Sequence, residues 1–344
     1  MNLRALETAV PLNTFTQSDC WEILARSPAK ERLRDRSMGL LQKVLTRPHG
    51  IDHRHFAIEK IEDVFTLPLD RLHEEFARHA PKLAGQSLQK ALAKSRIRPE
   101  ELDALLICTC TGYLCPGISS YVAEKLGLRG NTFLQDLVGL GCGAAIPTLR
   151  AAEALLARDP KAKVATVAVE ICSAAFYLDD DPGVLISACL FSDGAAAAIW
   201  EANNEGQFGQ REASGFDSIH IPENRELLRF EQKNGFLRNK LHRSVPEKAA
   251  EAVRELRNRA EDREASFLVH PGGRDVLDAV AKVLPNEPGL SESRKVLATH
   301  GNMSSPSILF ALKEALDHTS SPTHVWLTSF GAGFSAHSFS LQAS

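Results

Sequence analysis

The sequence predicts an α/β fold built from two pseudo-repeated halves. Short apolar runs occur at residues 104–111 ("ALLICTCT"), 164–171 ("VATVAVEI") and 195–200 ("AAAAIW"), and the first two are rich in residues that suit buried strands. Segments with helical spacing of apolar residues lie between them at 119–128 and 146–160, where Gly127 and Pro160 are typical stop signals. Strands that alternate with helices indicate α/β layering.

The second observation is a long-period internal repeat. The composition turns polar and charge-rich from about 202 to 262, and we predict one half over 1–205 and the other over 206–344. "LLICTCTGYLCPG" then pairs with "SFLVHPGG", and "LQDLVGLGCGAAIPTLRAAEAL" pairs with "KVLATHGNMSSPSILFALKEAL". "LISACLFSDGAAAAIW" pairs loosely with "VWLTSFGAGFSAHSFSL". A repeat of this period outweighs any single motif in predicting the fold.

Composition excludes several classes of protein. The 344 residues carry a net charge of −3, so there is no basic field for nucleic acid. The longest apolar stretches are shorter than the ~20 residues of a membrane span, and the N-terminus lacks a secretory pattern. Seven cysteines, an odd number, favour reduced thiols. We therefore expect a cytoplasmic protein with no nucleic-acid partner and no membrane span.

Cys142 is the first candidate for chemistry. It lies between Gly141 and Gly143, at a predicted turn from a strand to a helix. Glycine permits a positive φ there, and a helix N-terminus lowers the pKa of a thiol. A buried structural cysteine fits the motif equally well, because free cysteines are among the most buried residues.

His270 and Asn302 are the candidate partners of Cys142. His270 follows a short apolar strand, and the Pro-Gly-Gly after it predicts a sharp turn at the sheet end, where crevices of α/β folds lie. His300 is predicted to end another strand, in "VLATHGNM". Asn302 alone suits a helix N-cap. Together the three residues form a Cys–His–Asn set, in which histidine pairs with the thiolate and both N–H groups stabilise an oxyanion.

Two other kinds of site use similar residues. Papain-like cysteine proteases share the order Cys, His, Asn along the chain, and Gln135 stands where their oxyanion glutamine would. The local cysteine signature of those proteases is missing here, however, and their chains lack the internal repeat seen in this sequence. A zinc site could use Cys108, Cys110, Cys115 and His270. Alternate strand residues point to opposite faces, however, so Cys108 and Cys110 do not suit one tetrahedral ion.

Four motifs in order resemble one family, the type III polyketide synthases, which are the chalcone synthase-like branch of the thiolase fold. "GLGCGAA" is similar to the nucleophile motif, "VHPGGRDVLD" to the histidine motif and "HGNMSSPSILF" to the asparagine motif. "SFGAGF" is similar to the C-terminal G-F-G-P-G loop, from which Ser329 and Ala332 depart. The resemblance runs from "AVPLNTFTQ" to the end of the chain.

The resemblance implies a thiolase-like αβαβα five-layer fold, a homodimer and an acyltransferase of the EC 2.3.1 class that condenses CoA thioesters. Cys142 would carry an acyl group from acyl-CoA, and His270 and Asn302 would support decarboxylation of malonyl-CoA. No metal or other cofactor is implied. Phe191 matches an aromatic gate between the CoA tunnel and the cavity, and Ser304 matches a residue near the catalytic centre.

The resemblance also suggests pocket residues. Cys110, Cys172 and Ala175 stand where plant members carry threonines, which makes a more apolar and slightly roomier pocket. We therefore expect aliphatic starters and alkylpyrone or alkylresorcinol products. Cys115 replaces a methionine that reaches the partner subunit's cavity in plant relatives.

The resemblance does not decide which residues contact CoA, and it leaves one alternative function open. Lys43, Arg47 and Arg54, in "KVLTRPHGIDHRH", are candidates for the CoA phosphates, although a charge run also suits a plain solvated face. The nearest rival is a ketoacyl-ACP synthase III-like condensing enzyme, which shares the fold and the triad and takes its acyl group from a carrier.

Overall fold

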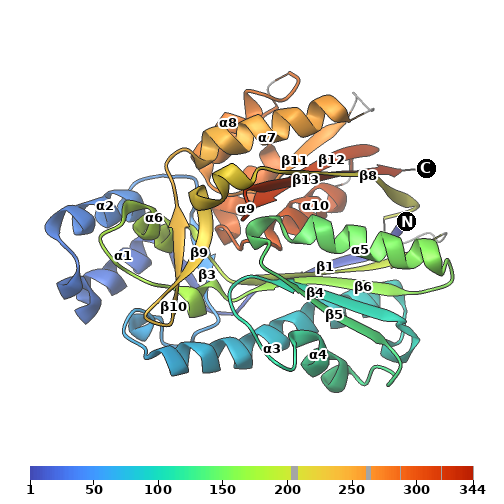
Figure 1. Cartoon of the computed structure of the whole chain (residues 1–344), viewed down its shortest axis with the longest axis horizontal. Helices are drawn as coiled ribbons and strands as arrows, with labels where there is room; N and C mark the ends of the chain where they lie inside the picture. The colour runs from blue at the N-terminus through green and yellow to red at the C-terminus, as the bar shows by residue number, and fades with distance from the viewer. Residues whose placement is uncertain (203–207, 261–264, 287, 319, 344) are drawn as a thin grey trace.

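The structure is a computed structural model that describes residues 1–202, 208–260, 265–286, 288–318 and 320–343 (Figure 1). Its strands are β1 (Asn2–Ala9), β2 (Thr14–Thr16), β3 (His53–His55), β4 (Ala104–Thr109), β5 (Phe133–Val138), β6 (Val164–Glu170), β7 (Gly194–Glu201), β8 (Arg211–His220), β9 (Leu228–Lys233), β10 (Phe236–Leu241), β11 (Ser266–Val269), β12 (His324–Gly331) and β13 (Ser335–Ala343). Its α-helices are α1 (Gln17–Arg26), α2 (Asp35–Thr46), α3 (Leu69–Ser95), α4 (Ile118–Leu126), α5 (Ala145–Arg158), α6 (Pro182–Leu190), α7 (Val245–Arg259), α8 (Arg274–Ala281), α9 (Ser291–His300) and α10 (Ser307–Asp317).

The main sheet confirms the internal repeat. Within the described residues its strand order is β11-β12-β13-β8-β1-β7-β6-β4-β5. The parallel pair β4 and β6 matches the parallel pair β11 and β12. The antiparallel steps from β6 through β7 to β1 match those from β12 through β13 to β8. The two halves join where Asn2 of β1 faces Glu212 of β8. The predicted division at 205/206 falls among residues that lie outside the described ones.

Five layers are visible in Figure 1, and three apolar clusters hold them together. Helices α5 and α10 lie between the two sheet halves, where Leu149 and Leu312 share a core with residues of both halves. Helices α3 and α4 cover the outer face of one half, and α7 and α8 cover that of the other. Successive strand residues face opposite layers, so Leu105 packs under α3 while Leu106 packs against α5 and α10. The fold is therefore the expected αβαβα arrangement.

Most predicted elements form as expected. The three apolar runs of the first half are β4, β6 and β7, and Gly127 ends α4 in the left-handed conformation with φ 71°. The third predicted pairing, of "LISACLFSDGAAAAIW" with "VWLTSFGAGFSAHSFSL", holds only in part. Strand β7 corresponds to β13 by its place in the sheet, but the counterpart of β12 is β6. Residues 185–190 instead belong to α6. Among the described helices, none has the length and hydrophobicity needed to cross a membrane.

His300 corrects one prediction, because it ends helix α9 and not a strand. The short run "VLA" suits a strand, yet the buried residues of this segment are Ser293, Val296 and Leu297. Positions i, i+3 and i+4 mark one face of a helix. The nucleophile turn thus follows a strand, β5, whereas the asparagine turn follows a helix.

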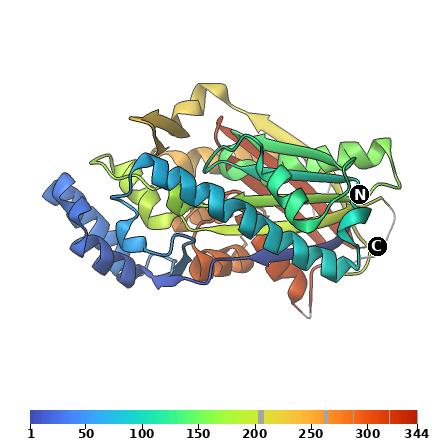
Figure 2. The ribbon, with the colours of Figure 1, turned by 90° about the horizontal axis from the view of Figure 1, so that it is seen from below.

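One end of the layered body carries extra elements. Figures 1 and 2 both show α1, α2 and α6 there, with the β9–β10 hairpin alongside. The hairpin contacts α6, and α2 packs between α1 and α6. The candidate site lies where these elements meet the ends of the central strands and helices.

Candidate active site

Cys142 lies in a tight turn between β5 and α5. Gly141 adopts φ 58°, and residues Gly141–Gly143 form a turn of 3-10 helix before α5 begins. The C-terminal glycine loop packs against this turn so closely that a Cβ on Gly331 would lie 2.4 Å from the carbonyl oxygen of Leu140. The hydroxyl of Ser329 donates to the carbonyl of Gly143 at 3.2 Å. The second half of the chain therefore holds the nucleophile turn of the first.

His270 follows β11 at the sheet end, as predicted. Its backbone N–H donates to the carbonyl of Thr328 at 2.9 Å, and its ring meets that of Phe330 edge-on at 5.3 Å. The side chain is 1% exposed. No described residue forms a hydrogen bond with its Nδ1 atom, which is fully buried.

Asn302 connects the two sides of the site. Its backbone pairs with Phe191 in a parallel bridge, in which Asn302 N donates to Leu190 and Ser192 N donates to Asn302. Its side-chain Nδ2 donates to the carbonyl of Gly272 at 3.2 Å, and its Oδ1 accepts from the N–H of Ser304 at 2.8 Å. Helix α10 begins only at Ser307, so Asn302 does not act as its N-cap. The amide is instead fixed with its N–H groups toward the histidine turn.

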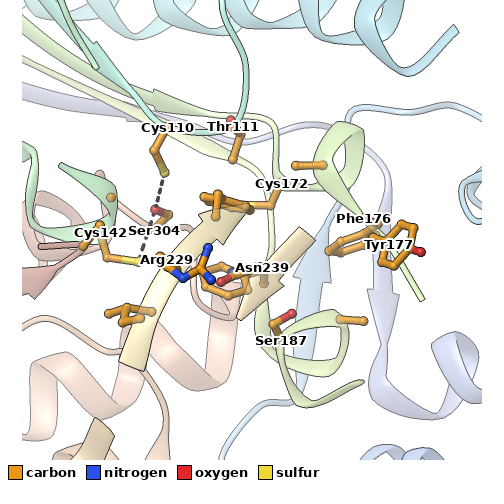
Figure 3. A pocket seen from close by; sticks show the side chains of 17 residues that line it. Cys110, Thr111, Cys142, Cys172, Phe176, Tyr177, Ser187, Arg229, Asn239 and Ser304 are labelled. Atoms are coloured by element: carbon orange, nitrogen blue, oxygen red, sulfur yellow. Dashed lines mark hydrogen bonds between the residues drawn. The ribbon is translucent and has the colours of Figure 1, made fainter. Parts of the chain in front are cut away.

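Ser304 lies between two sulfur atoms. Its Oγ donates to Sγ of Cys142 at 3.3 Å and lies 3.3 Å from Sγ of Cys110 (Figure 3). Its φ of 61° is uncommon for any residue other than glycine. Strain of this kind is concentrated at functional sites, where the surrounding structure maintains it.

Two spaces meet at Cys142 and Phe191. The outer cleft, of about 380 Å³, is lined by Cys142, Phe191, His270 and Asn302, and α6, β10 and α8 form its rim. The structure thus brings the three predicted catalytic residues together. The inner pocket is lined by Cys110, Cys142, Cys172, Ala175, Phe191 and Ser304, and is tight at about 30 Å³. Phe191 lies on both linings, at the junction where a gate would stand.

The charges at the site differ from the prediction. Burial raises the pKa of the Cys142 thiol to about 12, opposed in part by the hydrogen bond from Ser304. Burial lowers the pKa of His270 to about 3. The expected lowering of the thiol pKa at a helix N-terminus is therefore not found, because desolvation of the thiolate dominates. Both groups are neutral in this closed site.

A buried carboxylate, Glu170, is a residue that the sequence analysis missed. It ends β6 and accepts hydrogen bonds from the backbone N–H groups of Cys110 and Thr111, at 2.9 and 3.1 Å. The hydroxyl of Ser305 donates to its other oxygen at 2.5 Å. Burial raises its pKa. An acidic residue at the end of an apolar run was the available signal, because such a residue needs partners in the core.

The candidate CoA residues separate into two groups. Lys43 and Arg47 are exposed at the end of α2, near the cleft residue Val44. Arg54 is a correction, because its side chain is 2% exposed and donates to the carbonyls of Ala188 and Phe191. A buried guanidinium already bound to carbonyls does not reach a phosphate at a tunnel mouth.

The structure adds two basic residues to the rim of the outer cleft, Arg243 and Arg274. Both are exposed, and Arg274 is engaged by Asp275 at 3.2 Å. The sequence analysis did not single them out. Their positions in the chain, after β10 and at the start of α8, gave no sign that they share one rim with α2.

Two further candidates lie away from the site. Cys115 is exposed and is not among the residues lining the inner pocket or the outer cleft. Gln135 is exposed on β5, the edge strand, so it does not supply an oxyanion hole.

The cysteines weighed for a zinc site lie apart. Cys108 is buried in the central core while Cys110 lines the inner pocket, and no group of metal-binding side chains is found among the described residues.

Comparison with known proteins agrees with this geometry. The family model "FAE1/Type III polyketide synthase-like protein" matches residues 13–213, and "Chalcone and stilbene synthases, C-terminal domain" matches 218–338. The chain is 27% identical to 1,3,6,8-tetrahydroxynaphthalene synthase of Streptomyces coelicolor, over 95% of this chain and 88% of that protein. It is 25% identical to the alpha-pyrone synthesis polyketide synthase-like protein Pks18 of Mycobacterium tuberculosis, over 93% and 84%.

Solved structures share the fold over nearly the full length. The crystal structure of the Streptomyces coelicolor tetrahydroxynaphthalene synthase superposes with a TM-score of 0.87, at 23% identity over 100% of both chains. That of PKS-I from the brown alga Ectocarpus siliculosus superposes with a TM-score of 0.88, at 20% identity over 99% and 98%.

Proposed function

Because the chain belongs to the type III polyketide synthase family, an acyltransferase class of condensing enzymes, we propose that it extends an acyl-CoA starter with malonyl units by repeated decarboxylative Claisen condensation. The observation that carries the proposal is that Cys142, His270 and Asn302 line one cleft, although they lie on separate turns of the two halves. Such an enzyme needs no metal and no cofactor beyond its CoA substrates. It would act in the cytoplasm, where its cysteines stay reduced.

The first step loads the starter. The sulfur of Cys142 attacks the thioester carbonyl of acyl-CoA, and the tetrahedral oxyanion collapses to release CoA thiol. The thiol proton passes to the neutral imidazole of His270, which returns it to the departing CoA sulfur. A pKa of about 12 for Cys142 means that the thiolate forms only as this proton moves.

The second step makes the carbon–carbon bond. Malonyl-CoA loses CO₂, and its remaining electron pair forms an enolate whose oxygen accepts hydrogen bonds from His270 and Asn302. One N–H of Asn302 is held by Gly272, which aims the amide and leaves the second N–H for the enolate. The enolate carbon attacks the Cys142 thioester, the carbon–sulfur bond breaks, and a β-ketoacyl-CoA two carbons longer forms.

The apolar part of the inner pocket's lining supports an aliphatic starter, while Thr111, Ser187, Arg229 and Asn239 make up a polar part. Cys110, Cys172, Ala175 and Phe191 present thiols, a methyl group and a ring to the acyl chain. These groups favour methylene chains over phenolic hydroxyls, which would lose hydrogen bonds to water. Pks18 is named for alpha-pyrone synthesis, in keeping with an alkylpyrone product, and an alkylresorcinol is the other expected product.

The rim of the outer cleft supports CoA binding. We assign the phosphates to Arg243, assisted by Arg274, with Lys43 and Arg47 on the neighbouring end of α2. A mouth with several cations suits a diphosphate. Arg243 has no ion-pair partner among the residues that the structure describes, so it gains most from binding a phosphate.

The edge strand β5 supports a homodimer. Phe133, Leu134 and Val138 are exposed on this strand, by 49%, 37% and 52%, and its outer edge has no partner strand among the described residues. Tyr121 is exposed on α4, which packs beside β5. An apolar sheet edge of this kind is a liability in a monomer, and a second copy of the chain would cover it.

One experiment separates these functions. The purified protein is incubated with acyl-CoAs from acetyl to palmitoyl and coumaroyl, together with either malonyl-CoA or a malonyl-carrier protein, and the products are identified by mass spectrometry. We expect released products that contain several malonyl units, made most efficiently from aliphatic starters. A single unit added to a malonyl-carrier protein would support the ketoacyl-ACP synthase III-like alternative, and a preference for coumaroyl-CoA would reject the aliphatic starter.

A further inference from the structure

Asn239 places a buried amide in the wall of the inner pocket. The residue is 8% exposed, and its side chain has no hydrogen-bond partner among the residues that the structure describes. In Figure 3 it lies between Cys142 and Phe176, among the side chains that line the pocket. A buried amide without a partner costs free energy, so its presence in this wall points to a ligand that bonds to it.

Three hydroxyls and the guanidinium of the same lining already have partners. The hydroxyls of Thr111, Ser187 and Ser304 each donate to a neighbouring residue, at 2.9, 2.8 and 3.3 Å. Arg229 forms an ion pair with Glu231 at 2.8 Å. These groups are held by the protein itself, whereas the amide of Asn239 keeps two N–H donors and an oxygen acceptor that no described residue engages.

The β9–β10 hairpin directs Asn239 toward the site. Successive strand residues face opposite sides, and Leu241, two positions along β10, lines the outer cleft. Phe230, which pairs with Asn239 across the hairpin, also lines the inner pocket. Arg238 faces the other way and donates to Asp179, in the loop before α6, at 2.8 Å. The strand is thus held from its far side, and the amide is in place before a substrate binds.

An extended acyl chain offers the oxygen that this amide can bond. Each condensation leaves a keto group on the third carbon of the chain, where a simple acyl group has only a methylene. The inner pocket measures about 30 Å³, so the first carbons of an acyl chain on Cys142 would lie close to its walls. An N–H of Asn239 can donate to the keto oxygen, and in the enol form the hydroxyl can donate to the amide oxygen.

We propose that Asn239 binds the β-keto oxygen of an extended chain on Cys142, so that the inner pocket prefers chains that have already been extended over simple acyl groups. A site built to bond an oxygen rejects the analogue that lacks it, because the buried amide is then left unpaired. The hydrogen bond keeps a β-ketoacyl intermediate on the enzyme for another round, which raises the number of malonyl units added before release. This inference rests on the proposed function and deepens it, because it names the β-ketoacyl chain as the ligand of Asn239.

Two starters with the same carbon chain test the hydrogen bond. Acetoacetyl-CoA and butyryl-CoA differ only at the third carbon, and kcat/KM for their extension with malonyl-CoA is measured for each. Asn239→Leu keeps the size of the side chain and matches Leu237 and Leu241 on the same strand face. In this variant we expect the ratio of acetoacetyl-CoA to butyryl-CoA to fall about tenfold relative to the wild-type protein. Comparing ratios cancels the greater reactivity of the ketoacyl thioester itself.

A second measurement follows the chain after loading. With butyryl-CoA as the starter, Asn239→Leu should release more product that contains a single malonyl unit and less that contains several, as measured by mass spectrometry. Asn239→Val, which also suits a strand, is a second variant with the same expected result. Gln89→Leu makes the same replacement on the exposed face of α3 and should match the wild-type ratio and products. The melting temperature shows that each protein is folded.

The outcomes separate this inference from the function on which it rests. An unchanged ratio in folded Asn239→Leu, or an equal fall in Gln89→Leu, would overturn the role of the amide. If the wild-type protein makes no product from either thioester, it is the proposed function that fails. If it extends butyryl-CoA and the ratio does not depend on residue 239, it is this inference alone.

Discussion

The hydroxyl of Ser304 donates a hydrogen bond to the sulfur of Cys142 at 3.3 Å, from a backbone held at φ 61°. The left-handed conformation costs a residue with a Cβ about 1 kcal/mol. Oδ1 of Asn302 accepts from the N–H of Ser304 and so helps to maintain it. The same short loop therefore carries the amide proposed to bind the oxyanion and the hydroxyl that contacts the proposed nucleophile.

Replacing Ser304 tests this coupling. In Ser304→Ala we expect alkylation of Cys142 by iodoacetamide, followed by mass spectrometry, to slow about tenfold, because the hydroxyl lowers the thiol pKa. Ser304→Gly loses the same hydrogen bond and relieves the strain. It should show the same slow alkylation and unfold with about 1 kcal/mol more free energy than Ser304→Ala. Unchanged alkylation in both variants would show that the hydroxyl does not act on the thiolate.

The roles proposed for Cys142, His270 and Asn302 predict that condensation and malonyl-CoA decarboxylation depend on different residues. Cys142→Ala should abolish condensation and keep malonyl-CoA decarboxylation, measured as acetyl-CoA formed. His270→Ala and Asn302→Ala should each slow decarboxylation about a hundredfold, since each removes a donor to the enolate oxygen. Loss of decarboxylation in a folded Cys142→Ala variant would contradict these roles.

Arg243 predicts a salt-dependent effect on CoA binding. Arg243→Ala should raise KM for malonyl-CoA about tenfold at low ionic strength with little change in kcat, and the difference should shrink in 0.5 M salt as screening increases. Arg158→Ala, at the far end of α5, is the control for general charge loss. An unchanged KM in Arg243→Ala combined with a raised KM in Arg47→Ala would place the phosphates at α2 instead.

The exposed edge strand predicts the oligomeric state. The wild-type protein should elute with the mass of a dimer by light scattering, and Phe133→Glu on β5 should shift it toward the monomer, because it places a charge in the covered edge. Leu12→Glu is a matched control, since Leu12 is 99% exposed in the loop after β1. A dimer that survives Phe133→Glu would place the interface elsewhere.

Buried histidines predict weaker folding in mild acid. Burial lowers the pKa of His270 to about 3 and those of His300 and His337 to about 4, below their ordinary value of 6.5. Their stabilising contribution is complete above pH 6.5 and is lost as the pH falls toward 4, because the unfolded chain then binds protons that the folded protein does not. Asp193, with its pKa raised to about 6 by burial, opposes one of the three below pH 6.

His337→Gln isolates one of these contributions. The ring of His337 contacts the hydroxyls of Ser218 and Ser335, which glutamine can also bond. Between pH 6 and 4.5, the free energy of unfolding measured with urea should fall with decreasing pH less steeply than in the wild-type protein, by about 1 kcal/mol per pH unit. An identical slope would mean that His337 is protonated in the folded state.

The predicted and observed structures agree most where a local pattern has a local cause. "GLGCGAA" indicates a turn because glycine adopts a positive φ more readily than any other residue, and Gly141 does have a positive φ. Alternating strands and helices indicated layering, and the pairing of the two halves indicated the duplication that the sheet order displays. The prediction of a strand before His300 was wrong because an apolar run of three residues is too short to show the period of a strand or of a helix.

The sequence by itself determined the layered fold and its duplication, and it singled out Cys142, His270 and Asn302, which the structure places on one cleft. Only the tertiary structure decided that Arg54 is buried under Phe191, that Ser304 bridges Cys110 and Cys142, and that Asn239 lines the inner pocket. The reason is physical: periodicity reports which face of an element is buried, whereas the contacts on that face depend on segments far away in the chain. A pocket is made of such contacts, so its shape appears only after folding.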